Sequence, residues 1–425
     1  MTSTLDHQIE RYADLLINSG VNLQPGQSLR IGAELEHAAF VRLVTAAAYR
    51  AGARYVHIDW NDAPTTKQRL LYSEQTDLNF LPHYEVVRHQ EMVDEGWARL
   101  ALTGDAYPDL YDDVDPMRIR QIAQVRAQKL KFYSQAQMSN ELAWCVAGVP
   151  TRAWAQKVFP QLAPVEAESQ LWATILRTCR VDQPDPVAAW QQQDRRLKQV
   201  VDFLAQHAVR AVRFLDKVAA SDGKPRTDLT IGLTDAPHWL GGGAETTKGL
   251  PFFPNMPTEE IFTTPHNGRT TGWVRTSKPT FPLERRVENA YFRFAAGEVV
   301  DYHAETGQAV LEQFFAIPGA RRLGEVALVD VRSPVNAVNT IFYDILFDEN
   351  AASHIAFGEA YPEGMAGSAG MSEETLAAHG VNLADTHVDF MIVTPTLSLY
   401  GLCADGREIP LMVDGQFVEE ILRNG

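Results

Sequence analysis

The sequence predicts an α/β domain built on a mostly parallel sheet, followed by a mixed α+β domain rich in antiparallel strands. The chain has 425 residues, whereas one hydrophobic core rarely organises more than roughly 250–300, which favours two domains. Short strands alternate with amphipathic helices in the first half, and strand-like runs between Gly and Pro turns dominate the second. We place the two domains at 1–205 and 206–425.

The predicted first domain opens with a helix at 5–19, whose apolar residues recur at helical spacing. A strand at Ser28–Ile31, an Ala-rich helix at His37–Ala51 and a strand at Arg54–Trp60 follow. Strands joined by a helix are typical of parallel pairing, because parallel strands need a long crossover connection. The pattern continues with helices near 84–95 and 116–128, strands at 98–103 and 142–148, and helices at 151–158, 168–178 and 187–207.

The predicted second domain consists mainly of short strands with few helices. Antiparallel pairs are favoured there, because the runs follow one another through short turns. The predicted helices lie near 306–315, 348–357 and 372–378. The predicted strands are Ala211–Leu215, Asp228–Leu233, Glu288–Ala295, Glu298–Ala304, Glu325–Val329, Thr340–Leu346, Thr386–Val393 and Leu411–Val413.

Charge and composition exclude several classes of partner. The formal net charge is −16, from 38 Lys and Arg against 54 Asp and Glu, so we expect no nucleic-acid partner. No apolar run approaches the roughly 20 residues that span a bilayer, so we expect no membrane partner. Cys145, Cys179 and Cys403 lie far apart and predict neither a disulfide framework nor a zinc knuckle. These features favour the cytoplasm.

The first domain has the strand–helix order of nucleotide-binding folds without their phosphate-binding motifs. Neither GxGxxG after the first strand nor GxxxxGK[ST] occurs in the sequence. The nucleophile elbow GxSxG and the helical zinc signature HExxH are also missing from the sequence. We therefore expect no nucleotide-type cofactor-binding residues, and the candidate chemistry lies in the second domain.

His387 and Asp389 lie two residues apart in a predicted strand. Alternate residues of a strand point to the same face, so their side chains would project together, about 7 Å apart. Such a pair can serve one metal ion or two adjacent ones. The alternative is a surface pair on an edge strand. The apolar run after Asp389 favours burial, where a carboxylate needs a partner.

Glu325 also opens an apolar strand, and a buried carboxylate without a partner is costly. Its partner could be Arg321 or Arg322 in a salt bridge, or a metal ion. Glu259 and Glu260 are adjacent, so in an extended segment they point to opposite faces and only one can join a given site.

His354 is expected near the C-terminal end of the helix at 348–357, where a lone histidine is more often structural. As a set, these residues supply two Glu, two His and one Asp from one domain, which is the ligand mix of a site for two metal ions. Oxygen and nitrogen ligands without thiolates suit Zn²⁺, Co²⁺ or Mn²⁺.

Four motifs follow one another along the chain and resemble a known family. They are Asn255–Pro265, Gly319–Val329, His354–Gly358 with Tyr361, and His387–Met391. Together they resemble the thermophilic-type metallo-aminopeptidases of peptidase family M29, and the likeness extends over nearly the whole chain. The runs Pro279–Pro282 and Phe314–Pro318 depart from the family pattern, which bears on substrate preference.

The resemblance implies an aminopeptidase acting on short peptides or an amine-bearing small molecule, and a homodimer that encloses the active site. The hypothesis is that two divalent ions, Zn²⁺ first and Co²⁺ or Mn²⁺ as alternatives, activate a water. Glu325 would take its proton and Tyr361 would hydrogen-bond the oxyanion. The implied ligands are Glu260, Glu325, His354, His387 and Asp389.

Two other functions stay open from the sequence. The first is a metal-dependent hydrolase of a non-peptide amide or a specialised amine substrate on the same scaffold. The second is a metal-stabilised binding protein without turnover, which the presence of all five ligand positions disfavours.

Overall fold

The structure is a computed structural model that describes residues 4–220 and 223–423. Its contacts divide the chain into two compact units. The first unit comprises the residues up to Gln191 and two later segments, Gly243–Pro257 and Thr340–Leu346, and the second comprises the rest. The chain therefore returns twice to the first unit after leaving it. The division into domains at 205/206 stays a prediction.

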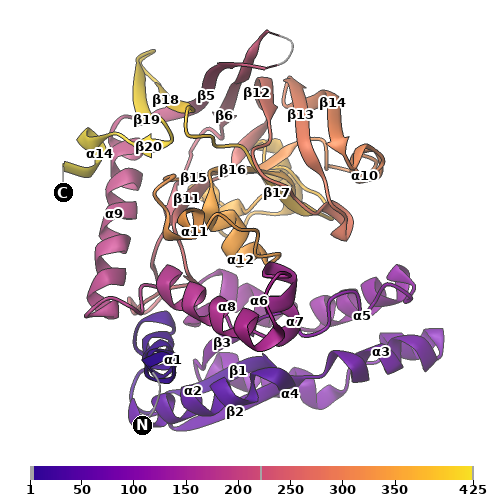
Figure 1. The fold of residues 1–425 in the computed structure, drawn as a ribbon. Coiled ribbons are helices and arrows are strands. Elements are labelled where there is room, and N and C mark those ends of the chain that lie inside the picture. Colours follow the sequence, from indigo (N-terminus) through magenta and orange to yellow (C-terminus); the bar gives the residue numbers. More distant parts are fainter. Residues whose placement is uncertain (1–3, 221–222, 424–425) are drawn as a thin grey trace. The chain divides into compact units, whose positions relative to one another are not determined.

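The first unit is built on a parallel sheet with the strand order β10-β4-β3-β1-β2. All the strand pairs of this sheet that the structure describes are parallel, as the strand–helix order predicts. Its helices and most of its strands are drawn from indigo to magenta in Figure 1. The strands are β1 (Ser28–Glu34), β2 (Tyr55–Asn61), β3 (Ala98–Thr103), β4 (Trp144–Gly148) and β10 (Asn255–Met256).

The helices of the first unit begin where the sequence supplies caps. At the start of α5, the Asp115 carboxylate accepts a hydrogen bond from the backbone N–H of Met117. At the start of α7, the Thr151 hydroxyl accepts one from the backbone N–H of Trp154. No helix in the described residues is both long and apolar enough to cross a membrane. The helices are α1 (Thr4–Leu15), α2 (Ala38–Arg50), α3 (Ala63–Tyr72), α4 (His83–Asp94), α5 (Pro116–Lys129), α6 (Lys131–Met138), α7 (Arg152–Val158), α8 (Pro164–Thr178) and α9 (Pro186–Gln206), the last of which ends in the second unit.

The second unit contains two larger antiparallel sheets, which confirms the predicted change of fold class. The first has the order β14-β13-β12-β6-β5-β18-β19-β20, and the second has the order β17-β16-β15-β11-β7. The strands of the first sheet are β5 (Val209–Ala219), β6 (Pro225–Leu233), β12 (Pro265–Arg275), β13 (Glu288–Ala295), β14 (Glu298–Thr306), β18 (Ser398–Cys403), β19 (Glu408–Val413) and β20 (Gln416–Phe417). The strands of the second sheet are β7 (Leu240–Gly241), β11 (Glu260–Thr263), β15 (Leu323–Val329), β16 (His354–Gly358) and β17 (His387–Met391).

Short elements join these sheets. A two-stranded ladder pairs β8 with β9 in the first unit. Helix α13 begins after Ser372, whose hydroxyl accepts from the backbone N–H of Thr375, as the predicted helix at 372–378 requires. These elements are β8 (Ala244–Glu245), β9 (Pro251–Phe252), α10 (Gln308–Phe314), α11 (Pro334–Ala337), α12 (Ile345–Asp348), α13 (Glu373–Ala378) and α14 (Glu419–Arg423).

One face of the five-stranded sheet belongs to the core of the second unit. Val326 and Leu328 of β15, Ile355 and Phe357 of β16, and Phe390 of β17 are fully buried in it. Because side chains alternate along a strand, the residues between them point to the opposite face. That second face carries the polar side chains of the candidate site.

The predicted helix at 348–357 is wrong. Only a short turn at Glu349–Ala351 is helical after α12, and His354 begins strand β16. The segment His354–Gly358 is buried along its whole length, between β15 and β17. The sequence of a strand that is buried on both faces is a short, continuous run of apolar residues. The spacing of apolar residues in such a run does not distinguish a strand from a buried helix.

The predicted strand at Thr340–Leu346 is also wrong. The segment belongs to the first unit and has no strand, and α12 starts at Ile345. Its apolar residues serve packing instead. Phe342 is fully buried, and its carbonyl accepts a hydrogen bond of 2.5 Å from the indole Nε1 of Trp154. The segment is therefore held by the burial of single side chains and by a hydrogen bond to α7, and not by pairing with a strand.

Candidate metal centre

The candidate site lies on four neighbouring strands of the second unit. Cross-strand pairing sets Glu325 opposite Ala356, and Ala356 opposite Asp389. Residues paired across a sheet point to the same face, so both carboxylates lie on one face with an alanine between them. Two residues before Ala356, His354 points to that face as well.

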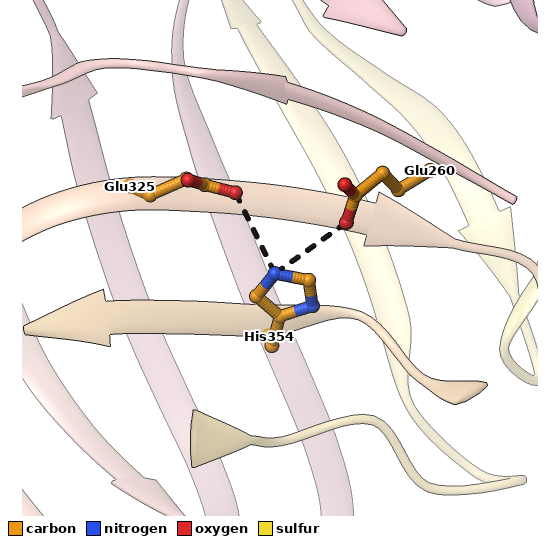
Figure 2. A group of neighbouring side chains, drawn as sticks. All are labelled: Glu260, Glu325 and His354. Carbon is orange, nitrogen blue, oxygen red and sulfur yellow. Dashed lines mark ion pairs between the residues drawn. The ribbon is translucent and has the colours of Figure 1, made fainter. Parts of the chain in front are cut away.

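His354 stands between the carboxylates. Its Nε2 lies 3.5 Å from Glu260 Oε2, 3.5 Å from Glu325 Oε1 and 3.8 Å from Asp389 Oδ1. Figure 2 shows the imidazole pointing from its strand towards the carboxylates of Glu260 and Glu325. One ligand atom from each of these three residues lies within 4.8 Å of the other two, a spacing that a single metal ion can span.

The second imidazole shares the same carboxylates. His387 Nε2 lies 3.6 Å from Glu325 Oε2 and 3.5 Å from Asp389 Oδ1. The two oxygens of Glu325 therefore face different imidazoles, Oε1 towards His354 and Oε2 towards His387. A carboxylate in this position can bridge two centres. The structure thus brings all five sequence-predicted residues together.

Backbone carbonyls fix the orientation of both imidazoles. His354 Nδ1 lies 3.1 Å from the carbonyl of Ala352, and His387 Nδ1 lies 2.7 Å from the carbonyl of Glu359. A carbonyl only accepts, so each Nδ1 carries its proton and donates. When the ring is neutral, Nε2 presents a lone pair to the carboxylate cluster, which is the arrangement of metal-binding histidines.

The two adjacent glutamates have different surroundings. Glu260 faces His354, whereas the Glu259 Oε2 accepts a hydrogen bond of 3.0 Å from Gln193. The backbone N–H of Glu259 donates to the side-chain carbonyl of Asn350 at 2.6 Å. Adjacent residues of an extended segment point to opposite faces, so Glu260 faces the candidate metal centre. Glu259 points away from it and is held by Gln193 and Asn350.

Arginine does not neutralise Glu325. Arg322 pairs with Glu298 at 3.2 Å, and Arg321 donates to the carbonyls of Phe315 and Val299. Glu325 instead lies against the two imidazoles and is 5% exposed, so its charge is balanced inside the cluster.

Mutual electrostatics displace the pKa values of the cluster. Burial raises the pKa of Glu260, and the charges of Glu325 and Asp389 raise it further. Burial alone would lower the pKa of His387, but the hydrogen bond and charge of Asp389 outweigh it and raise that pKa to about 9. The pKa of His354 is likewise raised, because Glu325, Asp389 and Glu260 outweigh burial. Without metal, the imidazoles therefore hold protons at neutral pH.

Tyr361 stands beside the cluster. The centre of its ring lies 4.9 Å from that of His387 and 6.1 Å from that of Phe262, and 39% of the residue is exposed. Burial, then the charges of Glu325 and Asp389, raise the pKa of Tyr361 well above its ordinary value. The hydroxyl therefore stays protonated and can donate a hydrogen bond.

Sequence reasoning missed Glu349, a further carboxylate at the site. Burial, with the charges of Glu260 and Asp389, raises the pKa of Glu349 well above its ordinary value. The Glu349 carboxylate forms no ion pair with His354 or His387. It therefore lies further from the imidazoles than the other carboxylates of the site, which come within 3.8 Å of one of them. The expected helix over this segment concealed its proximity to the cluster. The sequence did offer one indication of this role, because Glu349 lies only a few residues before the candidate ligand His354.

The donor set fits divalent cations. Buried carboxylates need a compensating charge, and in the described part of the chain the buried Oε2 of Glu260 accepts no hydrogen bond. Three carboxylates and two neutral imidazoles offer the mixed oxygen and nitrogen ligands of Zn²⁺, Co²⁺ or Mn²⁺ sites. The residues present therefore suit such ions.

Comparison with known proteins agrees with this chemistry. Residues 5–417 match the model of a family described as thermophilic metalloprotease (M29). The chain belongs to the M29 family. M29 membership makes it a hydrolase of peptide bonds that depends on divalent metal.

Several M29 relatives are similar over nearly their whole length. "Aminopeptidase 2" of Geobacillus stearothermophilus is 39% identical over 98% of this chain and 99% of its own. "Aminopeptidase T" of Thermus aquaticus is 37% identical over 96% of this chain and 98% of its own. The solved structure of wild-type AmpT from Thermus thermophilus has a TM-score of 0.88 at 35% identity, and covers 98% of this chain and 100% of its own. The fold of this chain is thus the fold of AmpT.

Proposed function

We propose that this M29 protein is an aminopeptidase with two divalent metal ions held by Glu260, Glu325, His354, His387 and Asp389. The observation that carries the proposal is the position of Glu325, whose two oxygens face two separate imidazoles. With one imidazole on each side of Glu325, these five residues would hold two ions in neighbouring positions. The names of the relatives as aminopeptidases support the same activity.

Glu325 and Tyr361 would carry out the proton and charge chemistry. When bound, the ions would supply Lewis-acid chemistry that lowers the pKa of a water and polarises the scissile carbonyl. Glu325, central in the cluster, would take the proton of that water and later pass it to the leaving amine. Tyr361 keeps its proton, so its hydroxyl would donate a hydrogen bond to the oxyanion of the tetrahedral intermediate.

Glu349 would hold the α-ammonium of the substrate. An aminopeptidase must place a free amino terminus beside the reacting carbonyl, and a carboxylate is the natural partner of an ammonium. Burial and the charges of Glu260 and Asp389 raise the pKa of Glu349, so its neutral form is favoured before substrate binds. A nearby ammonium would lower that pKa again and favour the carboxylate that pairs with it. Glu349 makes no ion pair with either imidazole of the site. This position leaves it available for the substrate and would limit cleavage to the first peptide bond.

The deciding experiment measures metal content and turnover on one preparation. We expect about two ions per subunit, loss of activity with a chelator, and recovery with Zn²⁺, Co²⁺ or Mn²⁺. The substrates are an unblocked peptide, its N-acetylated form and a set of non-peptide amides. Cleavage of the unblocked peptide alone supports the proposal. Equal cleavage of the acetylated peptide, preference for non-peptide amides, or a single ion per subunit would contradict it.

The homodimer and the cytoplasm, which the family resemblance and the composition imply, stay predictions. Sedimentation of the purified protein checks the first of them, with a mass of about twice the 47.4 kDa of one chain as the expected result.

A further inference from the structure

A row of polar side chains crosses the parallel sheet of the first unit. Strand register aligns His57 of β2 with Arg30 of β1, Arg30 with Arg99 of β3, and Arg99 with Trp144 of β4. Partners in register point to the same face of a sheet, so these side chains lie side by side. In the described part of the chain, α6 packs against both α4 and α5. Each of these helices contributes side chains to the cluster: Arg88 comes from α4, Arg126 from α5 and Gln137 from α6.

The carboxylates near this row are already shared among several cations. Asp59 pairs with Arg30 at 2.6 Å and with Arg88 at 2.5 Å. Glu85 pairs with Arg88 at 2.8 Å and lies 3.9 Å from Arg126. Three guanidinium groups, those of Arg30, Arg88 and Arg126, thus share two carboxylates. Arg99 of the same row adds a fourth positive charge, which makes the excess over these two carboxylates about two charges.

Arg99 carries the uncompensated part of that charge. Its Nη1 donates to the side-chain carbonyl of Gln137 at 3.0 Å, and the described residues provide no carboxylate partner for it. Burial lowers the pKa of Arg99, and the nearby charges of Arg30 and Arg126 lower it further. A half-buried cation surrounded by like charges is costly unless an anion joins it.

Trp144 adds a second donor that lacks a partner. Its indole Nε1 is buried and donates no hydrogen bond within the described structure. Trp144 is the register neighbour of Arg99, so the two donors lie on the same face of adjacent strands. Arg126 of α5 belongs to the same group, because its charge acts on Arg99, and 46% of its side chain is exposed to solvent.

We propose that Arg99, Arg126 and the indole N–H of Trp144 form a binding site for a phosphate group. A phosphate monoester carries a charge of about −1.5 to −2 at pH 7 and three acceptor oxygens, which matches the excess charge and the group of donors. The phosphate comes either as the free ion or as part of a small phosphorylated molecule. This site is independent of the metal centre, which belongs to the other unit.

The test measures binding of inorganic phosphate and of glycerol phosphate to the whole protein by calorimetry at fixed ionic strength, with acetate as the comparison anion. We expect saturable binding of at least one phosphate and none of acetate. Loss of a charged hydrogen bond in Arg99→Gln should weaken it at least about tenfold. The matched control is Arg152→Gln, which removes an exposed arginine paired with Glu168 and should leave binding unchanged.

Two further variants keep the outcome decisive. Phosphate can bind metal ions, so binding must persist in Asp389→Ala, and its loss there would place the anion at the metal centre and overturn the proposal. If Arg99→Gln does not fold, Trp144→Phe keeps an aromatic ring and removes the indole donor, and it should weaken binding several-fold. Absence of saturable binding, equal binding of acetate, or unchanged binding in both variants would also overturn it. Preference for glycerol phosphate over the free ion would identify a phosphorylated small molecule as the ligand.

Discussion

At the scale of single residues, the site depends on which member of an adjacent pair faces inwards. Glu260 and Glu259 have the same chemistry, yet one lies 3.5 Å from an imidazole and the other accepts from Gln193 and is anchored by Asn350. Position on the strand therefore separates a candidate ligand from a supporting residue.

We expect Glu260→Gln to remove bound metal and to lower activity by more than the roughly 10–100-fold that supporting residues cost. Glu259→Gln should keep metal at the wild-type level, because its amide can still receive a hydrogen bond from Gln193. Metal analysis and kcat on both variants check this. If Glu259→Gln alone lost its metal, the assignment of the pair would be reversed.

The hydroxyl of Tyr361 is expected to act on the transition state. Tyr361→Phe keeps the ring against His387 and Phe262 and deletes one donor. Loss of an oxyanion donor typically lowers kcat on the order of 10²–10³. The measurement is kcat at saturating peptide, with metal per subunit on the same sample. A parallel loss of metal would make Tyr361 a structural residue, and an unchanged kcat would remove it from the mechanism.

Metal binding should release protons. The pKa of His387 is raised to about 9, so without metal this imidazole is protonated at neutral pH and loses its proton only as the pH rises through that value. A metal ion needs the neutral ring, so its affinity should rise with pH up to about 9. Calorimetry in two buffers of different ionisation enthalpy measures the released protons. Identical heats in both buffers would show that the imidazoles are already neutral.

At the scale of strands, small residues make room for the site. Ala356 lies between Glu325 and Asp389 in one cross-strand row, and Ala327 lies opposite His354 in the next. Both alanines are fully buried, so a larger side chain would fill the space between the ligands. One face of the sheet thus packs into the apolar core, and the other face carries the candidate ligands with small residues between them.

We expect Ala356→Leu to reduce bound metal strongly. Its added carbon atoms would separate Glu325 from Asp389, and overpacking at a buried position typically costs about 1–3 kcal/mol. The matched control is Ile355→Val, one residue away on the core face, which should cost about 0.5–1.5 kcal/mol of stability and keep its metal. Metal analysis and denaturant unfolding separate the two effects. Full metal content in Ala356→Leu would show that the strands can move apart.

At the scale of the whole molecule, the candidate centre holds together segments that are far apart in the sequence. Its candidate ligands come from β11, β15, β16 and β17, and the charges of Glu325 and Asp389 disfavour the ionised form of Glu260. Bound ions should therefore stabilise the second unit as well as activate the substrate.

A chelator should lower the thermal unfolding temperature of the wild-type protein. A ligand at about 100 times its Kd adds roughly 2.7 kcal/mol to the free energy of unfolding. Asp389→Ala should unfold at a lower temperature and respond little to the chelator. Scanning calorimetry of both proteins, with and without chelator, measures the difference. An equal response in both would place the stabilising metal elsewhere.

Local sequence was sufficient for much of this description. Alternation along a strand placed His387 and Asp389 on one face, and the order of strands and helices predicted a parallel sheet in one part of the chain and antiparallel pairing in the other. These features depend on residues within one element or its neighbours, so a short stretch of sequence contains them. The candidate ligands were also named from the sequence, partly through the family resemblance.

Tertiary structure alone decided the remaining features. His354 begins a strand and not the end of a helix, because β15 and β17 enclose it on both sides. Glu349 joins the site through the turn before that strand, and Thr340–Leu346 packs in the first unit although the residues on either side belong to the second. In each case the deciding neighbours come from distant parts of the chain. Their contacts outweigh local preference, since burial of a whole segment stabilises more than the small differences in intrinsic propensity.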